Sequence, residues 1–267
     1  MTASLAMGAP GARGVSIAAS NIGMLFEREG RAVHALDDVT LDIPAGRFCS
    51  ILGPSGCGKS TLLMLVAGLY SPTRGRIALD GQPLTGCYPN AGIVFQTDVL
   101  LPWLTVLDNV LLPAAVKRLP REPARARAHQ LLERVGLGGF EIHYPSELSG
   151  GMRQRASLCR ALLHEPSVLL MDEPFGALDA LTRERMQTDL MKLWADDLKT
   201  VMFITHDIEE AVLLSDEVVV MSPRPGRILR RLPIGLDHPR SPEVRRDPRF
   251  HRIVDEIRDL FHETGIL

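Results

Sequence analysis

A glycine-rich run that ends in a lysine and two hydroxyl residues is the segment best suited to chemistry. Residues 53–61 read GPSGCGKST, follow an apolar strand-like run and open a helical pattern. This G-x-x-x-x-G-K-[ST] spacing predicts a phosphate-binding loop, because its glycines let backbone N–H groups turn toward phosphate oxygens beside a positive helix N-terminus. Lys59 is then expected to contact the β- and γ-phosphates and Ser60 to offer its hydroxyl to Mg²⁺. The nucleotide-binding candidates in this run are Gly53, Pro54, Ser55, Gly56, Cys57, Gly58, Lys59, Ser60 and Thr61, the last supporting the loop.

Two adjacent carboxylates close a second apolar run. Residues 168–171 are apolar and lead directly into Asp172 and Glu173. The carboxyl ends of parallel strands are where such sheets bind ligands, and two neighbouring carboxylates there favour a cation. We expect Asp172 to hold Mg²⁺, directly or through water, and Glu173 to orient or deprotonate an attacking water, a role worth about 10²–10⁴ in rate.

A third motif, LSGGMRQR at residues 148–155, stands just before a helical pattern. Ser149 is a natural N-cap, but a cap does not require the two glycines that follow, each of which costs about 1 kcal/mol inside a helix. Gly150 and Gly151 therefore predict a close backbone approach, most simply a second anion-binding helix start. Taken singly, each motif has a plainer interpretation: a glycine-rich turn, a loop entry, or a capped basic helix.

The elements that must position these residues alternate between strand and helix. Strand-length apolar runs occupy 48–52, 92–95, 168–171, 201–205 and 217–221, and helical patterns occupy 59–68, 124–135, 151–164, 180–198 and 208–214. Because parallel neighbours need crossover connections, this alternation predicts a mainly parallel α/β core with both faces covered.

Two regions depart from that rhythm. Residues 97–149 are punctuated by proline and lack a strand of their own, which predicts a helical insertion. After residue 222, PRPGRI predicts a turn into an edge strand, and the apolar positions between 250 and 261 predict a helix with one packed face. The arginines of residues 224–258 are expected to form a solvated face, with a membrane-proximal surface or a regulatory contact as alternatives.

Composition excludes several classes of protein. The chain has 267 residues, 45% hydrophobic and 23% charged, with a formal net charge of −2, which excludes disorder, collagen and a global basic field for nucleic acid. Its apolar runs are shorter than the roughly 18–20 residues that span a bilayer. Residues 1–14 lack a signal-peptide core and are expected to be disordered, and the chain is expected to be cytoplasmic.

The four cysteines have no paired spacing, so all are expected to be free thiols. Cys57 lies in the phosphate loop beside Lys59 and a helix N-terminus, and both features predict a stabilised thiolate.

With these motifs in hand, the chain resembles the nucleotide-binding subunit of an ATP-binding cassette transporter, and LSGGMRQR is the diagnostic element. The resemblance implies an α/β P-loop cassette fold with a mainly parallel sheet core and an N-terminal antiparallel β portion. It implies one cassette domain over residues 15–267, with a helical subdomain at about 97–163 and a C-terminal extension at about 223–267. It also implies ATP and Mg²⁺ as cofactors, each ATP lying between the phosphate loop of one protomer and the LSGG of a second copy packed head to tail.

The resemblance assigns further roles. Gln96 matches the glutamine that touches Mg²⁺ or water, residues 177–179 match a dimer-contact loop, and His206 matches a histidine bonded to the γ-phosphate. Phe26 is the candidate for stacking on adenine, with ordinary core packing as its alternative. The implied catalytic set is Glu173, His206, Gln96 and Lys59, and the metal set is Ser60, Gln96 and Asp172. The nucleotide set gains Phe26, Gln96, Ser149, Gly150, Gly151, Asp179 and His206.

Two strings, at residues 101–110 and 175–182, resemble the importer branch for nitrate, aliphatic sulfonates and taurine. That branch implies permease subunits as partners, a solute-binding protein indirectly, no nucleic acid, and a place on the cytoplasmic face of the bacterial inner membrane. Pro102 and Trp103 are expected near a groove for a permease helix, although Trp103 could instead fill the core. The alternatives are a cassette ATPase that acts without a permease, or a cassette for another solute class. A small-molecule kinase is disfavoured by LSGGMRQR and His206.

Overall fold

The structure is a computed structural model that describes residues 14–28, 31–176 and 178–265. The segment expected to be disordered lies outside these ranges except for Gly14, and so does Ala177 of the expected dimer-contact loop.

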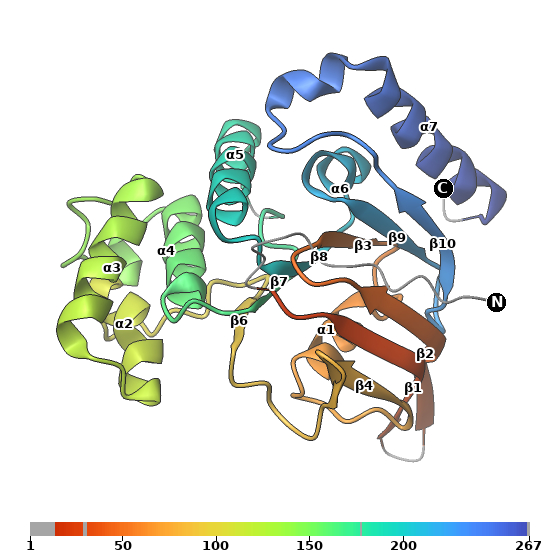
Figure 1. Ribbon diagram of the computed structural model, residues 1–267, viewed down its shortest axis with the longest axis horizontal. Helices are drawn as coiled ribbons and strands as arrows, with labels where there is room; N and C mark the ends of the chain where they lie inside the picture. The colour runs from red at the N-terminus through yellow and green to blue at the C-terminus, as the bar shows by residue number, and fades with distance from the viewer. Residues whose placement is uncertain (1–13, 29–30, 177, 266–267) are drawn as a thin grey trace.

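Within these ranges the chain builds two sheets (Figure 1). The larger has the order β10-β9-β3-β8-β7-β6, in which all neighbours are parallel except the edge strand β10. Its strands are β3 (Phe48–Leu52), β6 (Ala91–Val94), β7 (Val168–Asp172), β8 (Thr200–Thr205), β9 (Glu217–Met221) and β10 (Ile228–Pro233). The predicted parallel α/β core and the predicted edge strand are both confirmed.

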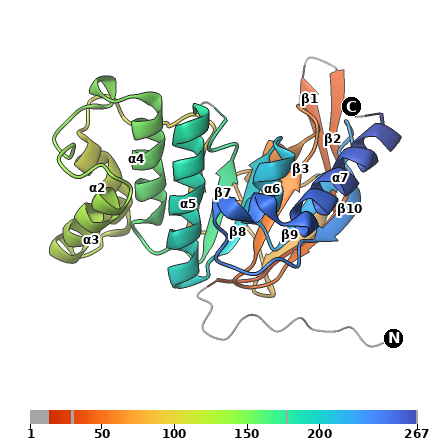
Figure 2. The same ribbon diagram turned by 90° about the horizontal axis from the view of Figure 1, so that it is seen from above.

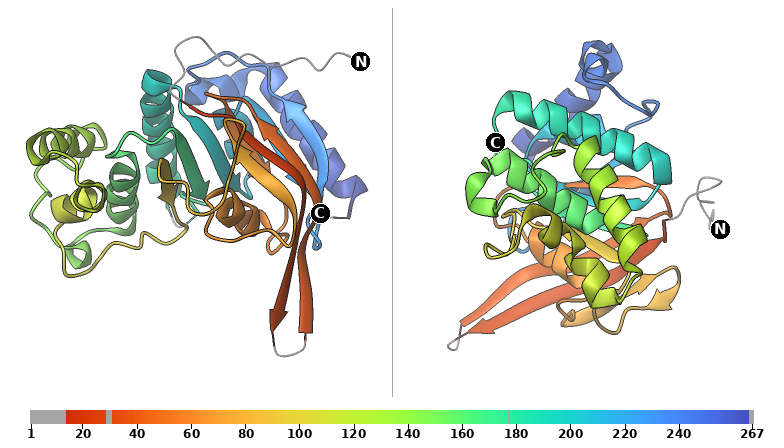
Figure 3. Two further views of the ribbon diagram at one scale, coloured as in Figure 1. Left: turned by 60° about the horizontal axis from the view of Figure 1, so that its bottom comes forward. Right: turned by 90° about the vertical axis from the view of Figure 1, so that its left-hand side faces the viewer.

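The smaller sheet is antiparallel, with the order β2-β1-β4-β5. Its strands are β1 (Ile17–Arg28), β2 (Arg31–Ile43), β4 (Arg74–Leu79) and β5 (Gln82–Pro83). The strands β1 and β2 run side by side as a long ribbon that extends beyond the parallel sheet (Figure 3). This sheet is the antiparallel N-terminal portion that the resemblance implied.

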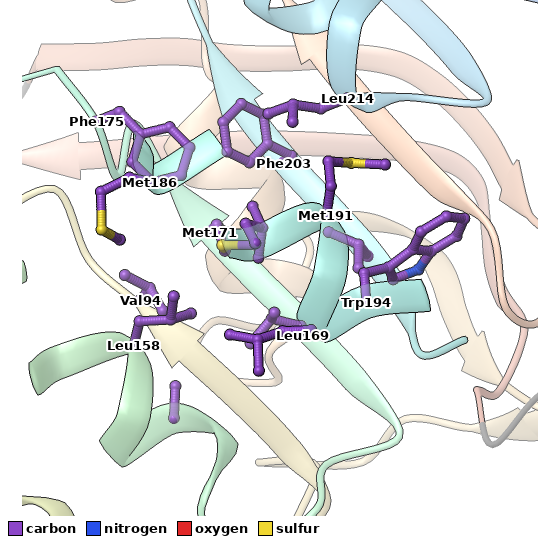
Figure 4. Packing of buried hydrophobic residues seen from close by; sticks show 14 of the residues in the cluster. Val94, Leu158, Leu169, Met171, Phe175, Met186, Met191, Trp194, Phe203 and Leu214 are labelled. Atoms are coloured by element: carbon purple, nitrogen blue, oxygen red, sulfur yellow. The ribbon is translucent and has the colours of Figure 1, made fainter. Parts of the chain in front are cut away.

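Both faces of the parallel sheet are covered, because successive residues of each strand enter two different cores. In β3, Phe48 and Leu52 belong to one hydrophobic cluster and Cys49 and Ile51 to the other. The first cluster includes residues of α5 (Ala180–Asp197), α6 (Ile208–Leu214) and α7 (Pro248–Glu263), and the second includes α1 (Lys59–Val66) and the antiparallel sheet. Figure 4 shows the first cluster, where Met171 and Phe203 of the sheet lie against Met186 and Met191 of α5.

The helices α2 (Val106–Lys117), α3 (Arg121–Arg134) and α4 (Gly150–Leu162) pack together at one end of the molecule, beside α5 (Figure 2). Short 3₁₀ turns at Pro145–Glu147 and Pro242–Arg246 complete the order. The insertion is helical as expected, but α3 begins three residues before its predicted start at 124, because its polar first turn hides the apolar period. Trp103, which precedes α2, is 70% exposed, so the alternative that it fills the core is wrong.

The C-terminal helix packs as predicted. Phe250, Val254, Ile257 and Phe261 are buried in the same cluster as α6. One arginine of the C-terminal stretch is also buried: Arg240 donates to the carbonyls of Val212, Leu213 and Ser215 at the end of α6. Its burial lowers the pKa of its guanidinium to about 10. A solvated face therefore does not describe the whole stretch.

Among the described residues, no helix combines the length and the apolar character that crossing a membrane would require.

Candidate active site

The loop between β3 and α1 follows the course expected of a phosphate-binding loop. Gly56 and Gly58 have φ of +74° and +109°, a region that favours glycine. A Cβ atom on Gly58 would also stand 2.8 Å from the Ala35 carbonyl oxygen of β2. The glycine spacing is therefore required both by backbone conformation and by the close approach of the antiparallel sheet.

Lys59 points back into this loop. Its side chain is 5% exposed, and Nζ donates to the carbonyl oxygens of Gly53 at 2.8 Å and Pro54 at 3.0 Å. The Pro54 carbonyl also accepts from the Cys57 N–H at 3.3 Å. Lys59 Nζ and the Cys57 N–H, two donors that suit phosphate oxygens, are thus held toward the inside of the loop by hydrogen bonds to the loop's own carbonyls.

Asp172 ends β7 next to the start of α1. It is 8% exposed, and burial together with the nearby Glu173 carboxylate raises its pKa, while a hydrogen bond with the Ser60 side chain and the Lys59 charge oppose the rise. A buried carboxylate beside a hydroxyl presents two hard oxygen ligands, the donor type that Mg²⁺ prefers. The residues present therefore fit the metal that the sequence predicted.

Three side chains from separate motifs meet at the carboxyl edge of the parallel sheet. Glu173 Oε2 lies 3.1 Å from His206 Nδ1 and 3.5 Å from Gln96 Nε2. The three residues follow β7, β8 and β6, which are neighbours in the sheet, so parallel pairing brings their ends together. Glu173 has φ of +43°, and its N–H donates to the Ile204 carbonyl oxygen at 3.0 Å. The backbone is thus held in a strained conformation that turns the carboxylate toward His206.

The LSGG segment begins α4. Ser149 Oγ accepts from the Met152 N–H at 3.3 Å, as a cap does. A Cβ atom on Gly151 would stand 2.8 Å from Thr182 Cγ2 of α5, whereas one on Gly150 would meet nothing closer than 3.9 Å. The close approach at Gly151 is therefore to its own chain. Of the two glycines, only Gly150 has open space around its Cα atom.

No hydrogen bond or ion pair within the described ranges joins Ser149, Gly150 or Gly151 to the phosphate loop. Asp179 is likewise occupied locally: it caps α5 by accepting from the Thr182 N–H at 3.0 Å, and this hydrogen bonding lowers its pKa. The structure thus brings together the phosphate loop, the carboxylate pair, Gln96 and His206. It does not add the LSGG segment or Asp179 to them.

Phe26 lies on β1, partly buried, with its ring edge-on to Tyr70 at 5.8 Å between centroids. Sequence reasoning did not find Tyr70, because it follows α1 outside every motif. Tyr70 is 46% exposed, so the pair presents an aromatic surface on the antiparallel side of the molecule.

Cys57 does not have the environment expected of a thiolate. The residue is 1% exposed, and its burial raises the pKa of the thiol more than the charges of Lys59 and Arg224 lower it. The predicted stabilised thiolate is therefore wrong, because spacing reveals the neighbouring cations but not the loss of water. All four cysteines are free, as expected.

A second residue missed from the sequence is Arg224. Its Nε and Nη2 donate to the Gly56 carbonyl oxygen at 3.1 Å and 2.9 Å. The only signal was PRPGRI, which predicted a turn but did not indicate what the turn would contact.

The sequence matches the ABC transporter family model over residues 36–176. It is 49% identical over 244 residues to the taurine import ATP-binding protein TauB of Rhizobium johnstonii, covering 89% of this chain and 92% of that protein. It is 46% identical over 227 residues to an uncharacterized ABC transporter ATP-binding protein of Methanocaldococcus jannaschii, with 85% of each chain covered.

Among solved structures, the fold is similar to the ATP-binding cassette MJ0796 in a dimeric post-hydrolysis state bound to ADP and Pi. The TM-score is 0.75 at 34% sequence identity, over 83% of this chain and 100% of that chain. A family match over more than half of the sequence, with relatives near half identity along most of it, agrees with the phosphate loop and carboxylate edge described above: the chain belongs to the ABC transporter family.

Proposed function

We propose that this chain is the ATP-binding and ATP-hydrolysing subunit that energises a membrane importer of a small solute. One observation carries the proposal: the phosphate loop, the Asp172–Glu173 pair, Gln96 and His206 converge on one edge of the parallel sheet. Relatives that are 44–49% identical to this chain are named taurine import ATP-binding proteins, which supports the importer class.

Binding follows from the way the loop is already arranged. A triphosphate would replace the Gly53 and Pro54 carbonyls as the acceptors of Lys59 Nζ, and the backbone N–H groups of the loop would donate to the remaining phosphate oxygens. Phe26 and Tyr70 supply an aromatic surface for the adenine. Thr61 and the other loop residues keep the helix N-terminus turned toward the phosphates.

Ser60, Asp172 and Gln96 are the residues that would hold Mg²⁺. When bound, the metal neutralises charge on the phosphate oxygens. The raised pKa of Asp172 supports this assignment. Burial and the Glu173 carboxylate destabilise the negative charge of Asp172, and a bound cation would stabilise it.

Hydrolysis requires a group that accepts a proton from water. Glu173 Oε2 can accept it as the water oxygen attacks the γ-phosphorus and the bond to the bridging oxygen breaks, leaving ADP and phosphate. His206, 3.1 Å from that oxygen and largely exposed, can both orient the carboxylate and donate to a γ-phosphate oxygen.

A second copy of the chain would complete each site. Among the described residues, no hydrogen bond or ion pair joins Ser149, Gly150, Gly151 or Asp179 to the phosphate loop of their own chain, and the open space at Gly150 suits an approaching phosphate. The dimeric form of the similar cassette supports a head-to-tail pair. ATP binding would close this pair, and hydrolysis with phosphate release would reopen it.

The wider assembly follows from the importer class. Transmembrane permease subunits would be the direct partners and a solute-binding protein an indirect one, with the chain on the cytoplasmic face of the bacterial inner membrane. Taurine, an aliphatic sulfonate or nitrate is the solute class. Residues 15–267 would form one cassette domain, with a helical subdomain at about 97–163 and a C-terminal extension at about 223–267. Exposed Trp103 lies on the surface expected to receive a permease helix.

The test is reconstitution of the chain with its permease and solute-binding protein. We expect phosphate release from MgATP that rises when the solute-loaded binding protein is added, together with solute uptake into vesicles. Phosphate release that is independent of the permease would favour a cassette ATPase without a transport role. Transfer of phosphate to an acceptor, in place of free phosphate, would contradict the ATPase assignment.

A further inference from the structure

The turn between β9 and β10 is built against the phosphate loop. Ser222 begins it, and its backbone N–H donates to the Arg227 carbonyl oxygen at 2.9 Å, while its Oγ accepts from the Arg227 N–H at 3.0 Å. Residues 222–227, which we name the β9–β10 turn, are therefore closed by their own hydrogen bonds. A turn with its own closure can hold a side chain in a fixed place.

The same turn is tied to the antiparallel sheet. Gly226 donates to the Ala35 carbonyl oxygen at 2.9 Å and accepts from the Asp37 N–H at 3.0 Å, and the Arg227 guanidinium pairs with the Asp37 carboxylate. A Cβ atom on Gly226 would stand 2.1 Å from the Cys57 carbonyl oxygen. The β9–β10 turn is thus wedged between β2 and the phosphate loop, with no room for a side chain at Gly226.

Arg224 reaches from this wedge to the outer side of the loop, where it donates twice to the Gly56 carbonyl oxygen. That carbonyl belongs to the same planar peptide group as the Cys57 N–H, and in a trans peptide the two point in opposite directions. Holding the carbonyl outward therefore keeps the Cys57 N–H turned inward. Inward is where it meets the Pro54 carbonyl, which also accepts from Lys59 Nζ.

We propose that Arg224 is a positioning residue for the phosphate-binding loop: it fixes the Gly56–Cys57 peptide so that its N–H and the neighbouring Lys59 meet the triphosphate in place. This inference rests on the proposed function, since it concerns the same nucleotide site. Arg224 acts through the loop and need not touch the nucleotide.

Charge adds to the effect of geometry. Arg227 is paired with Asp37, but no described carboxylate lies within ion-pair distance of Arg224. Its charge also lowers the pKa of the Cys57 thiol, although burial of that thiol has the larger and opposite effect. An unneutralised guanidinium on the outer side of the loop attracts a triphosphate through its field and polarises the Gly56–Cys57 peptide group that it contacts.

The experiment compares Arg224→Gln, Arg224→Lys and the wild type as full chains, with Arg230→Gln as the control. Arg230 lies on β10, is also exposed, and its substitution removes the same unit of charge away from the loop. The measurements are the dissociation constant for MgATP, the KM and kcat of phosphate release, the melting temperature without nucleotide, and amide exchange at Cys57.

We expect Arg224→Gln to raise the dissociation constant and KM for MgATP about tenfold, because the substitution removes hydrogen bonds from a charged donor. The kcat at saturation should change little. Arg224→Lys keeps a cation and should recover part of the affinity. Amide exchange at Cys57 should quicken in Arg224→Gln while the melting temperature stays that of the control.

Affinity in Arg224→Gln equal to that in Arg230→Gln would overturn the inference, and so would a lowered melting temperature with an equal loss of kcat. Either result leaves the proposed function intact, because the wild type still binds MgATP. A wild-type chain that fails to bind MgATP would remove the proposed function itself.

Discussion

Glu173 has a strained backbone and two polar neighbours, Gln96 and His206, and it lies outside the phosphate loop. Its proposed role in hydrolysis can therefore be tested separately from nucleotide binding by the loop. Glu173→Gln keeps an acceptor oxygen near His206 and the amide of Gln96 but removes the group that takes the proton. We expect the variant to bind MgATP as the wild type does, to accumulate a closed dimer, and to lose at least about 10²-fold in kcat. Single-turnover phosphate release and size-exclusion chromatography with MgATP are the measurements. Wild-type turnover in this variant would remove Glu173 from the role of base.

Asp172 is proposed to bind Mg²⁺, and its buried charge lowers the stability of the folded chain in the absence of the metal. Its folded pKa is raised, so the folded state holds the proton more tightly than the unfolded chain, and stability falls as the pH rises from the unfolded pKa to the folded pKa. At neutral pH the full cost is present. Asp172→Asn should therefore raise the melting temperature without nucleotide at pH 7, should gain little at pH 3, and should abolish stabilisation by MgATP. A melting temperature below that of the wild type at pH 7 would show that the Ser60 contact outweighs burial.

At this scale, the sequence predicted residues whose chemistry is encoded in local spacing. His206 was named only through the resemblance to the cassette family, whereas Lys59 and Asp172 could be named because a strand end or a helix start sets each one's position within a few residues. The thiol of Cys57 and the contact of Arg224 could not. Cys57 is enclosed by tertiary neighbours such as Gly226, which approaches its carbonyl oxygen, and Arg224 meets Gly56 across 168 residues of chain.

Among the elements, α4 lies close to α5 at Gly151 but has open space at Gly150, so the two glycines of the LSGG segment are distinct. Gly151→Ala places a methyl group within 2.8 Å of Thr182 Cγ2, so α4 and α5 must shift apart. We expect this variant to lose stability by about 1–3 kcal/mol in the absence of nucleotide. Thr182→Ser removes the opposing methyl group and should restore most of that loss in the double variant.

Gly150→Ala is the matched comparison, since space is open there. Its unfolding free energy should stay within about 1 kcal/mol of the wild-type value, and any change should be an increase, because alanine has a greater helix propensity than glycine. Its MgATP-dependent dimerisation should nevertheless fail, if the open space receives a phosphate from the partner. Urea denaturation and analytical ultracentrifugation measure the two effects. An equal loss of stability in both variants would contradict the distinction.

Element boundaries followed the strength of the apolar pattern. The strands β3 and β9 and the helix α6 have the predicted bounds. Both faces of the parallel sheet are buried, so the two strands are apolar runs interrupted only by Ser50 in β3 and by Glu217 at the start of β9. The helix α2 had no predicted bounds. Pro113 lies inside it and its last three residues are exposed, so neither a helix breaker nor an apolar period marked its ends.

Over the whole molecule, the C-terminal segment ties distant parts of the chain together. Arg240 caps the end of α6, the helix α7 packs on the same core, and the β9–β10 turn contacts both β2 and the phosphate loop. The resemblance placed this segment outside the core motifs, and its arginines looked like surface charges. Burial distinguishes Arg240 from the other arginines of this stretch, and contact with the Gly56 carbonyl distinguishes Arg224, which is itself exposed. Both properties arise from tertiary packing, so the sequence could not assign these residues.

The composite site can be tested by mixing two disabled chains. A Lys59→Ala protomer lacks the phosphate grip but retains its LSGG segment, and a Ser149→Ala protomer has the reverse defect. A head-to-tail dimer of the two holds one site with both defects and one with neither, because each site takes its loop and its LSGG from different chains. Differently tagged protomers, co-purified after mixing with MgATP, should therefore bind about one nucleotide per dimer and recover hydrolysis that neither parent shows.

The complementary control puts both substitutions in one protomer and pairs it with a wild-type chain. In that heterodimer each site contains one defect, so hydrolysis should stay lost although the same two residues are altered. If each protomer built its site alone, the first mixture would stay inactive and the second would keep one working site. The order of activity between the two mixtures therefore distinguishes a shared site from two separate ones, whatever the absolute rate of the assembly.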